Sequence, residues 1–433
     1  MVKLKTFPSF TATKLKFTGK RLVKIDPDAS RKTISSGVKN ASLKLASFSD
    51  YTNDNEDYTK AFNEADGIVF EGFRIAIVNE NLEENVSMLT GSSFSKGTFY
   101  YSEPERYVYA INDPSKKRTR DIKTEIEGSG KRTRRMKPLR PKSESFIDDK
   151  AASWGIHSIN VINSKYTGKG VNVSILDTGF NLNHPDFAGR VVNSRSFISG
   201  EGADDQNGHG SHCTGISAGN INQITKRRYG VAREANIFIG KVLSNAGSGS
   251  DSGILAGLEW AIINNCKIIS MSLGAPVYPG EPYSNIYNDV ARKAMSKGTL
   301  IVAAAGNESR RDQGIVKPVG HPANCPAIMA VGALDKNLNV AYFSCGGINP
   351  DGGQVDIAAP GVDVYSSWKS PSNYNIISGT SMATPFVAGV AALFREAFPD
   401  ATASEIWMYL TQNAIRLNLN SSDVGAGLVQ PPK

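Results

Sequence analysis

The sequence predicts an α/β protein, in which a mostly parallel central sheet is flanked by helices and is preceded by a small α+β domain. After residue 148, short apolar runs alternate with stretches of helical periodicity, which is typical of strands buried on both faces of a parallel sheet. Between the two parts, the residues are rich in Lys, Arg, Pro, Ser and Gly and include almost no large apolar side chain. These two observations predict two folded domains and a linker.

The large domain is predicted to span residues 149–433. Its expected elements are strands at residues 171–176, 237–242, 268–271, 300–304 and 328–331, and helices at residues 252–265 and 286–297. In parallel sheets of this kind, reactive groups gather at the carboxyl ends of the strands. The functional site is therefore expected at that edge.

The first domain is predicted to span residues 1–113. Residues 67–78 and 106–111 are rich in β-branched and aromatic side chains, which favours strands. Residues 114–148 are predicted to form a basic disordered linker and a region for processing, because so few apolar side chains cannot offset the entropy of ordering them.

The net charge of the chain is +8, from 49 basic and 41 acidic residues. Residues 116–142 contain 12 basic and 3 acidic residues, so this segment carries +9 and the rest of the chain −1. The basic balance therefore says little about the folded domains. Nucleic acid is not the expected partner, because no aromatic residue that could stack on a base is interleaved in the segment.

No apolar run approaches the roughly 18 residues of a membrane span, so no membrane partner is expected. The first residues do not have the pattern of a secretory leader, and 4 cysteines are too few for a disulfide scaffold. These features predict a cytoplasmic protein with reduced cysteines; a secreted protein is the alternative if a leader has been removed.

Three segments each present one reactive side chain beside glycine. Asp177 ends an apolar strand in Asp-Thr-Gly, His209 lies between two glycines, and Ser381 opens an apolar helix after Gly-Thr. A serine hydroxyl needs a base to become a nucleophile, a histidine titrates in the required range, and a buried carboxylate can orient the histidine ring. The three residues together predict a catalytic triad.

A fourth segment ends on an amide. Asn307 follows the apolar run Val302–Gly306, and its side chain would donate a hydrogen bond to the oxyanion of a tetrahedral intermediate. The backbone N–H of Ser381, at the start of its helix, is the expected second donor.

These four segments resemble those of the subtilisin family of serine proteases, in the order Asp, His, Ser, and the resemblance extends from about residue 149 to the C-terminus. It implies the three-layer subtilisin-like fold. It also implies a serine endopeptidase that hydrolyses extended polypeptide segments through an acyl-enzyme.

The resemblance further implies a cleft in which substrate pairs with two edge strands. The implied substrate-binding residues are Gly247, Ser248 and Gly249 on one side, Ser272, Leu273 and Gly274 on the other, and Ala304, Ala305, Gly306 and Gly320 around the primary specificity pocket. A glycine floor and small walls imply a preference for a large apolar residue before the scissile bond, and Glu308 at the rim would tolerate Lys.

Asp251 departs from the family, which often has a bulky residue at that position to close a more distal pocket. We expect Asp251 to favour a basic residue further upstream in the substrate.

Subtilases commonly begin as zymogens, in which an N-terminal domain helps folding and occupies the cleft until it is cut away. Residues 1–113 have the size and position for such an intramolecular inhibitor. The alternative is a catalytically silent or locked module of this family that binds peptides.

No cofactor is expected to be required, but calcium stays open. Asp186 matches a calcium ligand of the family and Asn220 and Asn222 lie in the corresponding loop, while the cations at residues 226–228 oppose a divalent ion there. His212 and Cys213 next to His209 would also suit a metal, but an ion on His209 would block its work as a base, so none is predicted.

Overall fold

A 7-stranded sheet forms the centre of the large domain, and every neighbouring pair in it is parallel. Across the sheet the order is β14 (Ile357–Pro360), β13 (Met329–Leu334), β12 (Leu300–Ala304), β10 (Ile268–Met271), β6 (Asn172–Asp177), β8 (Asn236–Lys241) and β7 (Val192–Ser196). The five predicted strands are all present; four of them lie within one residue of their expected bounds, and β13 extends three residues further, to Leu334.

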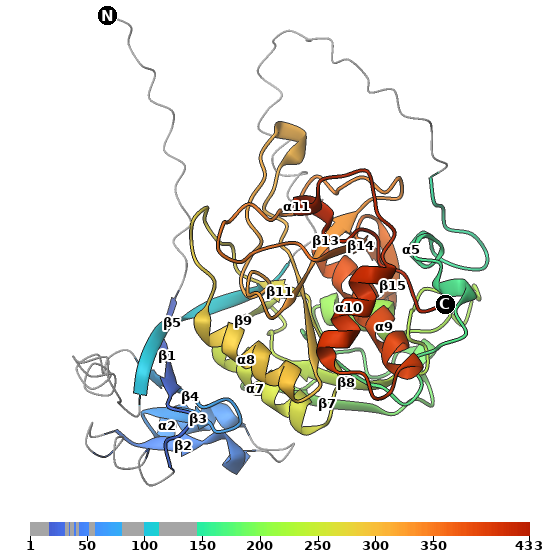
Figure 1. The fold of residues 1–433 in the computed structure, drawn as a ribbon. Helices are drawn as coiled ribbons and strands as arrows, with labels where there is room; N and C mark the ends of the chain where they lie inside the picture. The colour runs from blue at the N-terminus through green and yellow to red at the C-terminus, as the bar shows by residue number, and fades with distance from the viewer. Residues whose placement is uncertain are drawn as a thin grey trace, which may run out of the picture.

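Helices cover both faces of this sheet (Figure 1). One face packs against α6 (His209–Ala218), α9 (Thr380–Ala397) and α10 (Ala403–Asn413), and the other against α7 (Asp251–Ile263) and α8 (Asn285–Ser296). Successive strand residues alternate between the two hydrophobic cores, as the period of a β-strand requires. The three-layer α/β fold predicted from the sequence is confirmed.

The small side chains of α9 allow this helix to pack closely. A Cβ added to Gly389 would lie 2.6 Å from the Cβ of Val231 and 2.8 Å from the carbonyl oxygen of Ser217. Nothing larger than glycine therefore fits where α9 passes α6, and the N-terminus of α9 is held at the carboxyl edge of the sheet.

The structure is a computed structural model that describes residues 17–30, 34, 39, 43–51, 57–79, 99–111 and 145–433. Most of the predicted linker, 114–148, lies outside these residues.

A second sheet is formed mainly by the N-terminal part of the chain. Its strands are β1 (Phe17–Ile25), β2 (Leu45–Ser47), β3 (Gly67–Phe70), β4 (Ile75–Asn79) and β5 (Phe99–Ala110), which are joined at β5 by β9 (Ser248–Ser250) and β11 (Leu273–Gly274) of the large domain. In Figure 1, β5 leaves the small blue sheet and runs between β9 and β11. Strand β5 thus physically links the two parts of the molecule.

The N-terminal sheet shares a hydrophobic core with the large domain. Leu22, Phe48, Phe70 and Ile77 belong to the same buried cluster as the apolar residues of α7 and α8. One face of this sheet therefore packs against the two helices, as Figure 1 shows.

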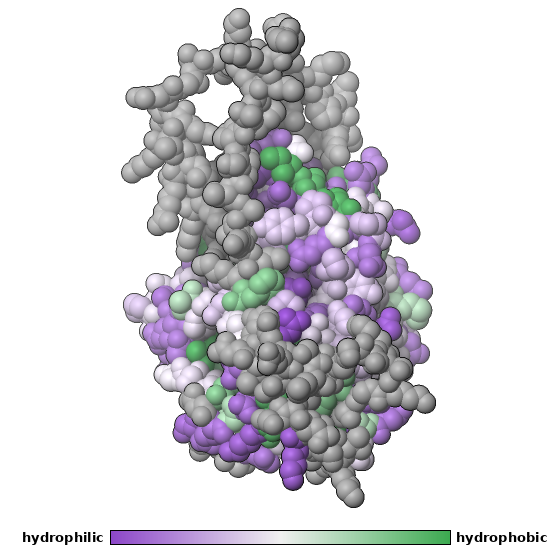
Figure 2. All heavy atoms as spheres, turned by 90° about the vertical axis from the view of Figure 1, so that its left-hand side faces the viewer, coloured by the Kyte–Doolittle hydropathy of each residue, from purple (hydrophilic) through white to green (hydrophobic). Residues whose placement is uncertain are grey.

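The remaining elements are short: α2 (Ala61–Glu64), α5 (Trp154–Ser158), α11 (Ser421–Val424) and the hairpin of β15 (Val364–Ser367) and β16 (Tyr374–Ile377). On the face seen in Figure 2, apolar side chains appear in small groups among hydrophilic ones. In the part of the chain that the structure describes, no helix has the length and apolarity to cross a membrane.

Candidate active site

Four side chains that are distant in the sequence meet at the carboxyl edge of the parallel sheet. Asp177 is the last residue of β6, and Asn307 follows the end of β12. His209 is the first residue of α6, and Ser381 lies in the first turn of α9. These are the positions at which sheets of this type place reactive groups.

Asp177 and His209 form a buried pair. Nδ1 of His209 lies 2.8 Å from Oδ1 of Asp177, and the two side chains are 6% and 0% exposed. Glycines on both sides of His209 make this possible, because a Cβ on Gly208 would lie 2.3 Å from the Trp368 ring and one on Gly210 would lie 2.2 Å from a backbone oxygen. The Gly-His-Gly sequence therefore allows α6 to begin directly beside β6.

The pKa of His209 lies well above its ordinary value. Burial is the largest influence and by itself lowers this pKa, but the negative charge of Asp177 and its hydrogen bond to the ring, together with Cys213, outweigh it. The Asp177 carboxylate thus stabilises the imidazolium form.

The hydroxyl of Ser381 donates to two carbonyl oxygens, those of Ile111 and Ser272, each at 3.1 Å. Nε2 of His209 is buried and has no hydrogen-bond partner among the described residues. The Cys213 sulfur contacts both residues: it lies 3.9 Å from Nδ1 of His209 and 3.5 Å from the Ser381 carbonyl oxygen. Cys213 thus contacts both His209 and Ser381, while the Ser381 hydroxyl points to the two carbonyls.

Thr380 fixes the side-chain amide of Asn307. Its backbone N–H and its hydroxyl both donate to Oδ1 of Asn307, at 2.9 and 3.0 Å. A Cβ on Gly379 would lie 2.9 Å from Nδ2 of Asn307 and 3.6 Å from the Ile111 carbonyl oxygen, so the amide donor and this oxygen approach the same glycine. The sequence analysis did not single out Thr380, although it directly precedes Ser381.

The predicted cleft is occupied by the chain itself. Tyr107, Val108 and Tyr109 pair antiparallel with β9, while Tyr109 and Ala110 pair antiparallel with β11. The amide of Ala110 donates to the Gly247 carbonyl at 2.8 Å. The amide of Ile111 faces the Ser272 carbonyl at 3.4 Å. All six predicted edge-strand residues, 247–249 and 272–274, therefore lie along this segment.

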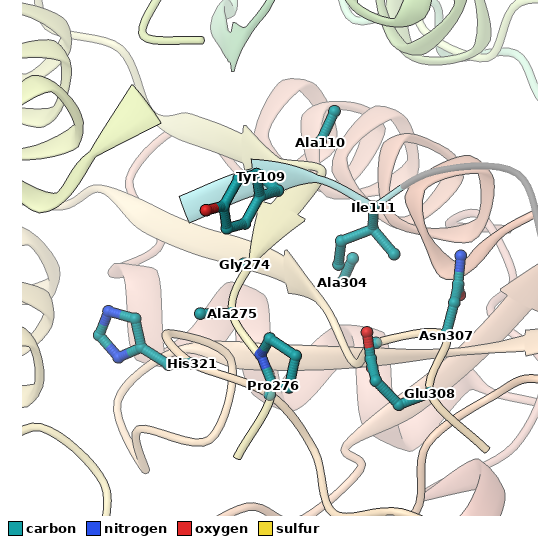
Figure 3. Close-up of a pocket in the computed structure, with 12 residues that line it drawn as sticks. Tyr109, Ala110, Ile111, Gly274, Ala275, Pro276, Ala304, Asn307, Glu308 and His321 are labelled. Carbon is teal, nitrogen blue, oxygen red and sulfur yellow. The ribbon is translucent and has the colours of Figure 1, made fainter. Parts of the chain in front are cut away.

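A pocket opens beside Ile111 (Figure 3). Its lining includes the predicted residues Ala304, Gly306 and Gly320, together with Glu308. Figure 3 shows the Ile111 side chain directed toward Ala304. The fourth predicted wall residue, Ala305, lies behind this lining, where its carbonyl accepts the Gly320 amide at 2.9 Å.

Two glutamates of β5 meet the N-termini of α7 and α8. Oε1 of Glu105 accepts the Ser252 amide at 2.9 Å, and Glu103 accepts the Asn285 amide at 2.8 Å and the Ser284 hydroxyl at 2.6 Å. Both carboxylates are buried and satisfy orphan N–H groups at the positive ends of the helices. The sequence reasoning missed them, although their spacing of two places them on one face of a strand.

In the part of the chain that the structure describes, Asp251 forms no ion pair with a lysine or arginine side chain, although the sequence suggested a basic partner for it. Its Oδ2 accepts the backbone amide of Arg106 at 2.8 Å, and its Oδ1 lies 3.1 Å from Nε2 of His321. The Arg106 guanidinium instead lies 3.8 Å from Glu103.

The surroundings of Asp186 do not fit calcium. Its Oδ1 accepts the Gln223 amide at 2.9 Å and the Tyr374 hydroxyl at 2.9 Å, and its Oδ2 accepts the Tyr229 hydroxyl at 2.7 Å. Oδ1 of Asn222 is engaged by two loop amides. Three donors thus point at the carboxylate where a cation would need free oxygen lone pairs.

Asp177, His209 and Cys213 have potential metal-ligand atoms within 4.8 Å of one another. Nδ1 of His209 already pairs with Asp177, and burial raises the pKa of the Cys213 thiol, which disfavours the thiolate that a metal binds. Nε2 of His212 faces the Val364 carbonyl at 3.0 Å, so the His-x-x-His-Cys set does not assemble.

A buried Asp–His pair beside a serine at a helix N-terminus, at the carboxyl edge of a parallel α/β sheet, is the architecture of a serine hydrolase. The sequence model of the subtilase family, Peptidase_S8, matches residues 168–428. The chain therefore belongs to the subtilase family and is a serine-type endopeptidase.

Sequence similarity to individual proteases supports this family assignment. Subtilisin DY from Bacillus licheniformis is 40% identical over 266 residues, which are 61% of this chain and 90% of that protein. The thermostable alkaline protease of Halalkalibacterium halodurans is 39% identical over 298 residues, 68% of this chain and 76% of its own length. Subtilisin E from Bacillus subtilis is 39% identical over 266 residues, 61% of this chain and 65% of its own.

Proposed function

We propose that this endopeptidase is made as a zymogen and that its first substrate is its own Ile111–Asn112 peptide bond. The observation that carries the proposal is the 3.1 Å distance between Oγ of Ser381 and the carbonyl oxygen of Ile111. Asn112 lies outside the described residues. The antiparallel pairing of β5 with two edge strands supports the same register, because proteases bind extended substrates in this manner.

We assign the chemical roles as follows. A turn of the Ser381 hydroxyl toward Nε2 of His209 allows the histidine to take its proton while Oγ attacks the peptide carbonyl carbon. Asp177 orients the ring and stabilises its charge, and Asn307 with the Ser381 N–H stabilises the oxyanion. His209 then protonates the leaving amine, and water hydrolyses the acyl-enzyme in a second passage through the same steps.

The primary specificity pocket is proposed to prefer large apolar residues. A cavity remains between Ile111 and the lining formed by Ala304, Gly306 and Gly320, so a side chain larger than isoleucine has room there. Oε2 of Glu308 at the rim is engaged by the Cys345 thiol at 3.3 Å.

The division of the chain follows from this role. Residues 1–113 are proposed as the folding and inhibitory domain, 114–148 as the processing linker and 149–433 as the peptidase domain. Glu103 and Glu105 support inhibition, because they attach β5 to α7 and α8 while it fills the cleft. A cytoplasmic location stays a prediction that these observations do not test.

Intact mass analysis tests the proposal. The wild-type chain should convert from 46.5 kDa to fragments that begin and end at the Ile111–Asn112 bond, and Ser381→Ala should remain at full length. Ser378→Ala is the matched control, since Ser378 lies in the same segment and its hydroxyl accepts the Asp363 amide instead.

The locked peptide-binding module is the other candidate, because a filled cleft is common to both. A fluorophosphonate probe separates them: labelling of Ser381 after linker cleavage requires a competent nucleophile. Cutting that persists in Ser381→Ala, or no labelling at all, would contradict the endopeptidase mechanism assigned here.

A further inference from the structure

The antiparallel ladder on one side of the cleft ends where α7 begins. Tyr107 pairs with Ser250, the last residue of β9, and the next residue of the large domain, Asp251, already turns into the helix. The backbone of Asp251 therefore cannot continue the ladder. Its side chain does so instead, because Oδ2 accepts the amide of Arg106 at 2.8 Å.

The Asp251 carboxylate is held rigidly. Its side chain is fully buried, and its other oxygen lies 3.1 Å from Nε2 of His321, which is 2% exposed. The Tyr287 hydroxyl donates to the Asp251 carbonyl at 3.0 Å, and the Tyr287 ring packs edge-on against His321 at 4.6 Å. A buried carboxylate with fixed partners keeps one orientation, so Oδ2 of Asp251 presents its acceptor in one direction, toward the amide of the bound strand.

His321 connects this carboxylate to the primary pocket. It is part of the lining of the cavity beside Ile111, at the end away from Asn307 in Figure 3. Its backbone exchanges hydrogen bonds with Ala275, directly after β11. The two walls of the cleft are thus tied together behind the bound strand.

We propose that Asp251 is a specificity-determining residue that binds the main-chain N–H of the sixth residue upstream of the scissile bond, and that His321 is its positioning residue. This inference rests on the proposed function, since the count starts at Ile111. A hydrogen bond to the main-chain N–H does not depend on the side chain of that substrate residue. The enzyme should therefore accept any residue with an N–H at the sixth position and discriminate against proline, which has none.

The expected size of the effect on kcat/KM follows from the charge of the Asp251 carboxylate. A hydrogen bond to a charged acceptor contributes more than a neutral one, and a substrate without the N–H leaves the buried carboxylate oxygen without its donor. We expect kcat/KM to fall about tenfold when that single N–H is removed.

The experiment uses the enzyme obtained by self-processing of the full chain. Two otherwise identical ten-residue peptides have alanine or N-methylalanine at the sixth position upstream of the cut, and a third has N-methylalanine at the seventh. The wild type should cleave the sixth-position N-methyl peptide about tenfold less efficiently than the alanine peptide, and the seventh-position peptide almost normally.

Each variant is judged by the ratio of kcat/KM for the alanine peptide to kcat/KM for the sixth-position N-methyl peptide. This ratio is an internal control, because general damage to an enzyme affects both peptides equally. Asp251→Ala should abolish the discrimination. Asp251→Asn, which keeps the shape and one acceptor, should reduce it to about threefold. His321→Gln, which retains a donor toward Asp251, should preserve the discrimination, and His321→Ala should weaken it.

Equal cleavage of both peptides by the wild type, or an undiminished ratio in Asp251→Ala and Asp251→Asn, overturns this inference and leaves the proposed endopeptidase intact. If the wild type cleaves none of the three peptides, the proposed function fails and this inference fails with it.

Discussion

The parallel sheet within residues 145–433 is covered on both faces by helices from the same part of the chain, whereas the sheet of residues 17–111 has one face packed against α7 and α8. On its other face the N-terminal sheet has a small cluster that includes Val23, Val69 and Val78. The large domain thus buries its own core, while the N-terminal part completes its core on the surface of its neighbour. This difference indicates that the first part depends on the second for its stability.

The polar contacts also show that the N-terminal part is completed by the large domain. At the interface, the buried carboxylates Glu103 and Glu105 from one part bond to helix amides of the other, and Glu259 of α7 accepts the Gly72 amide at 2.8 Å. Separation would leave both the carboxylates and the helix ends to water.

The largest effect is expected from Glu103→Gln combined with Glu105→Gln. Each substitution removes a negative charge at a helix N-terminus and should speed the opening of β5 about tenfold. The two substitutions together should therefore speed it about a hundredfold. The readout is hydrogen exchange of the β5 amides in the full-length Ser381→Ala chain.

Glu64→Gln is the matched control, since Glu64 is an exposed acid of the same part of the chain. Equal exchange rates in the double variant and the control would mean that the helix ends do not anchor the strand.

Glu259 should make the association of the two parts depend on pH. Burial raises the pKa of Glu259 to about 7, against the opposing effect of the Gly72 amide. Release exposes the group and returns its pKa toward 4.5. The assembled form therefore binds the proton more tightly, and its stability is lost as pH rises through 7. The protection of β5 should fall about tenfold from pH 6 to pH 8.

The control for Glu259→Gln is Asp356→Asn. Burial also raises the pKa of Asp356 to about 7, but Asp356 bonds to Ala330 inside the large domain. Only Glu259→Gln should remove the pH dependence of β5 exchange, measured against the intrinsic rate. An equal effect of both variants would assign the pH dependence to global unfolding.

Ile111→Phe should accelerate self-cleavage several-fold, up to about tenfold, because the aromatic ring fills more of the cavity beside Ala304. The rate is followed by intact mass. Tyr107→Phe, at an exposed position of the same strand outside the lining of this cavity, should leave the rate nearly unchanged. Slower cleavage by Ile111→Phe would refute the proposed preference for large residues.

The smallest effect is expected from a chelator. Because hydrogen-bond donors occupy the Asp186 carboxylate, EDTA should not change the melting temperature of the Ser381→Ala chain. Asp186→Ala, which leaves Tyr229 and Tyr374 without their acceptor, should lower the free energy of unfolding by about 2 kcal/mol. A drop in melting temperature with EDTA would contradict this prediction and indicate that the protein binds a cation.

Several elements could be predicted from local pattern alone. The runs around β6, β8, β10, β12 and β13 are continuously apolar because both of their faces are buried, and this signal needs no knowledge of the partners. Asp177, His209, Asn307 and Ser381 stand beside glycines and small residues that allow strands and helices to approach closely, so short motifs also indicated the candidate site.

Other contacts left no comparable local signal. A glutamate in a strand is usually solvated, and nothing near Glu105 in the sequence indicates that it meets Ser252, 147 residues away. The hydrogen bond of Asp251 left no local signal for the same reason, since the amide of Arg106 that it accepts is 145 residues distant. Charge complementarity suggested a basic side chain, but the start of α7 brings the carboxylate to a backbone group.

The sequence by itself determined five of the seven strands of the parallel sheet, the helices α7 and α8, and the chemical groups available for acyl transfer, because hydrophobic periodicity and short glycine-rich motifs act over a few neighbouring residues. Only the tertiary structure decided that Ile111 lies at Ser381, that two glutamates meet two helix ends and that Asp251 extends a β-ladder. Each of these depends on how separate elements pack, and packing joins residues whose positions in the chain are unrelated.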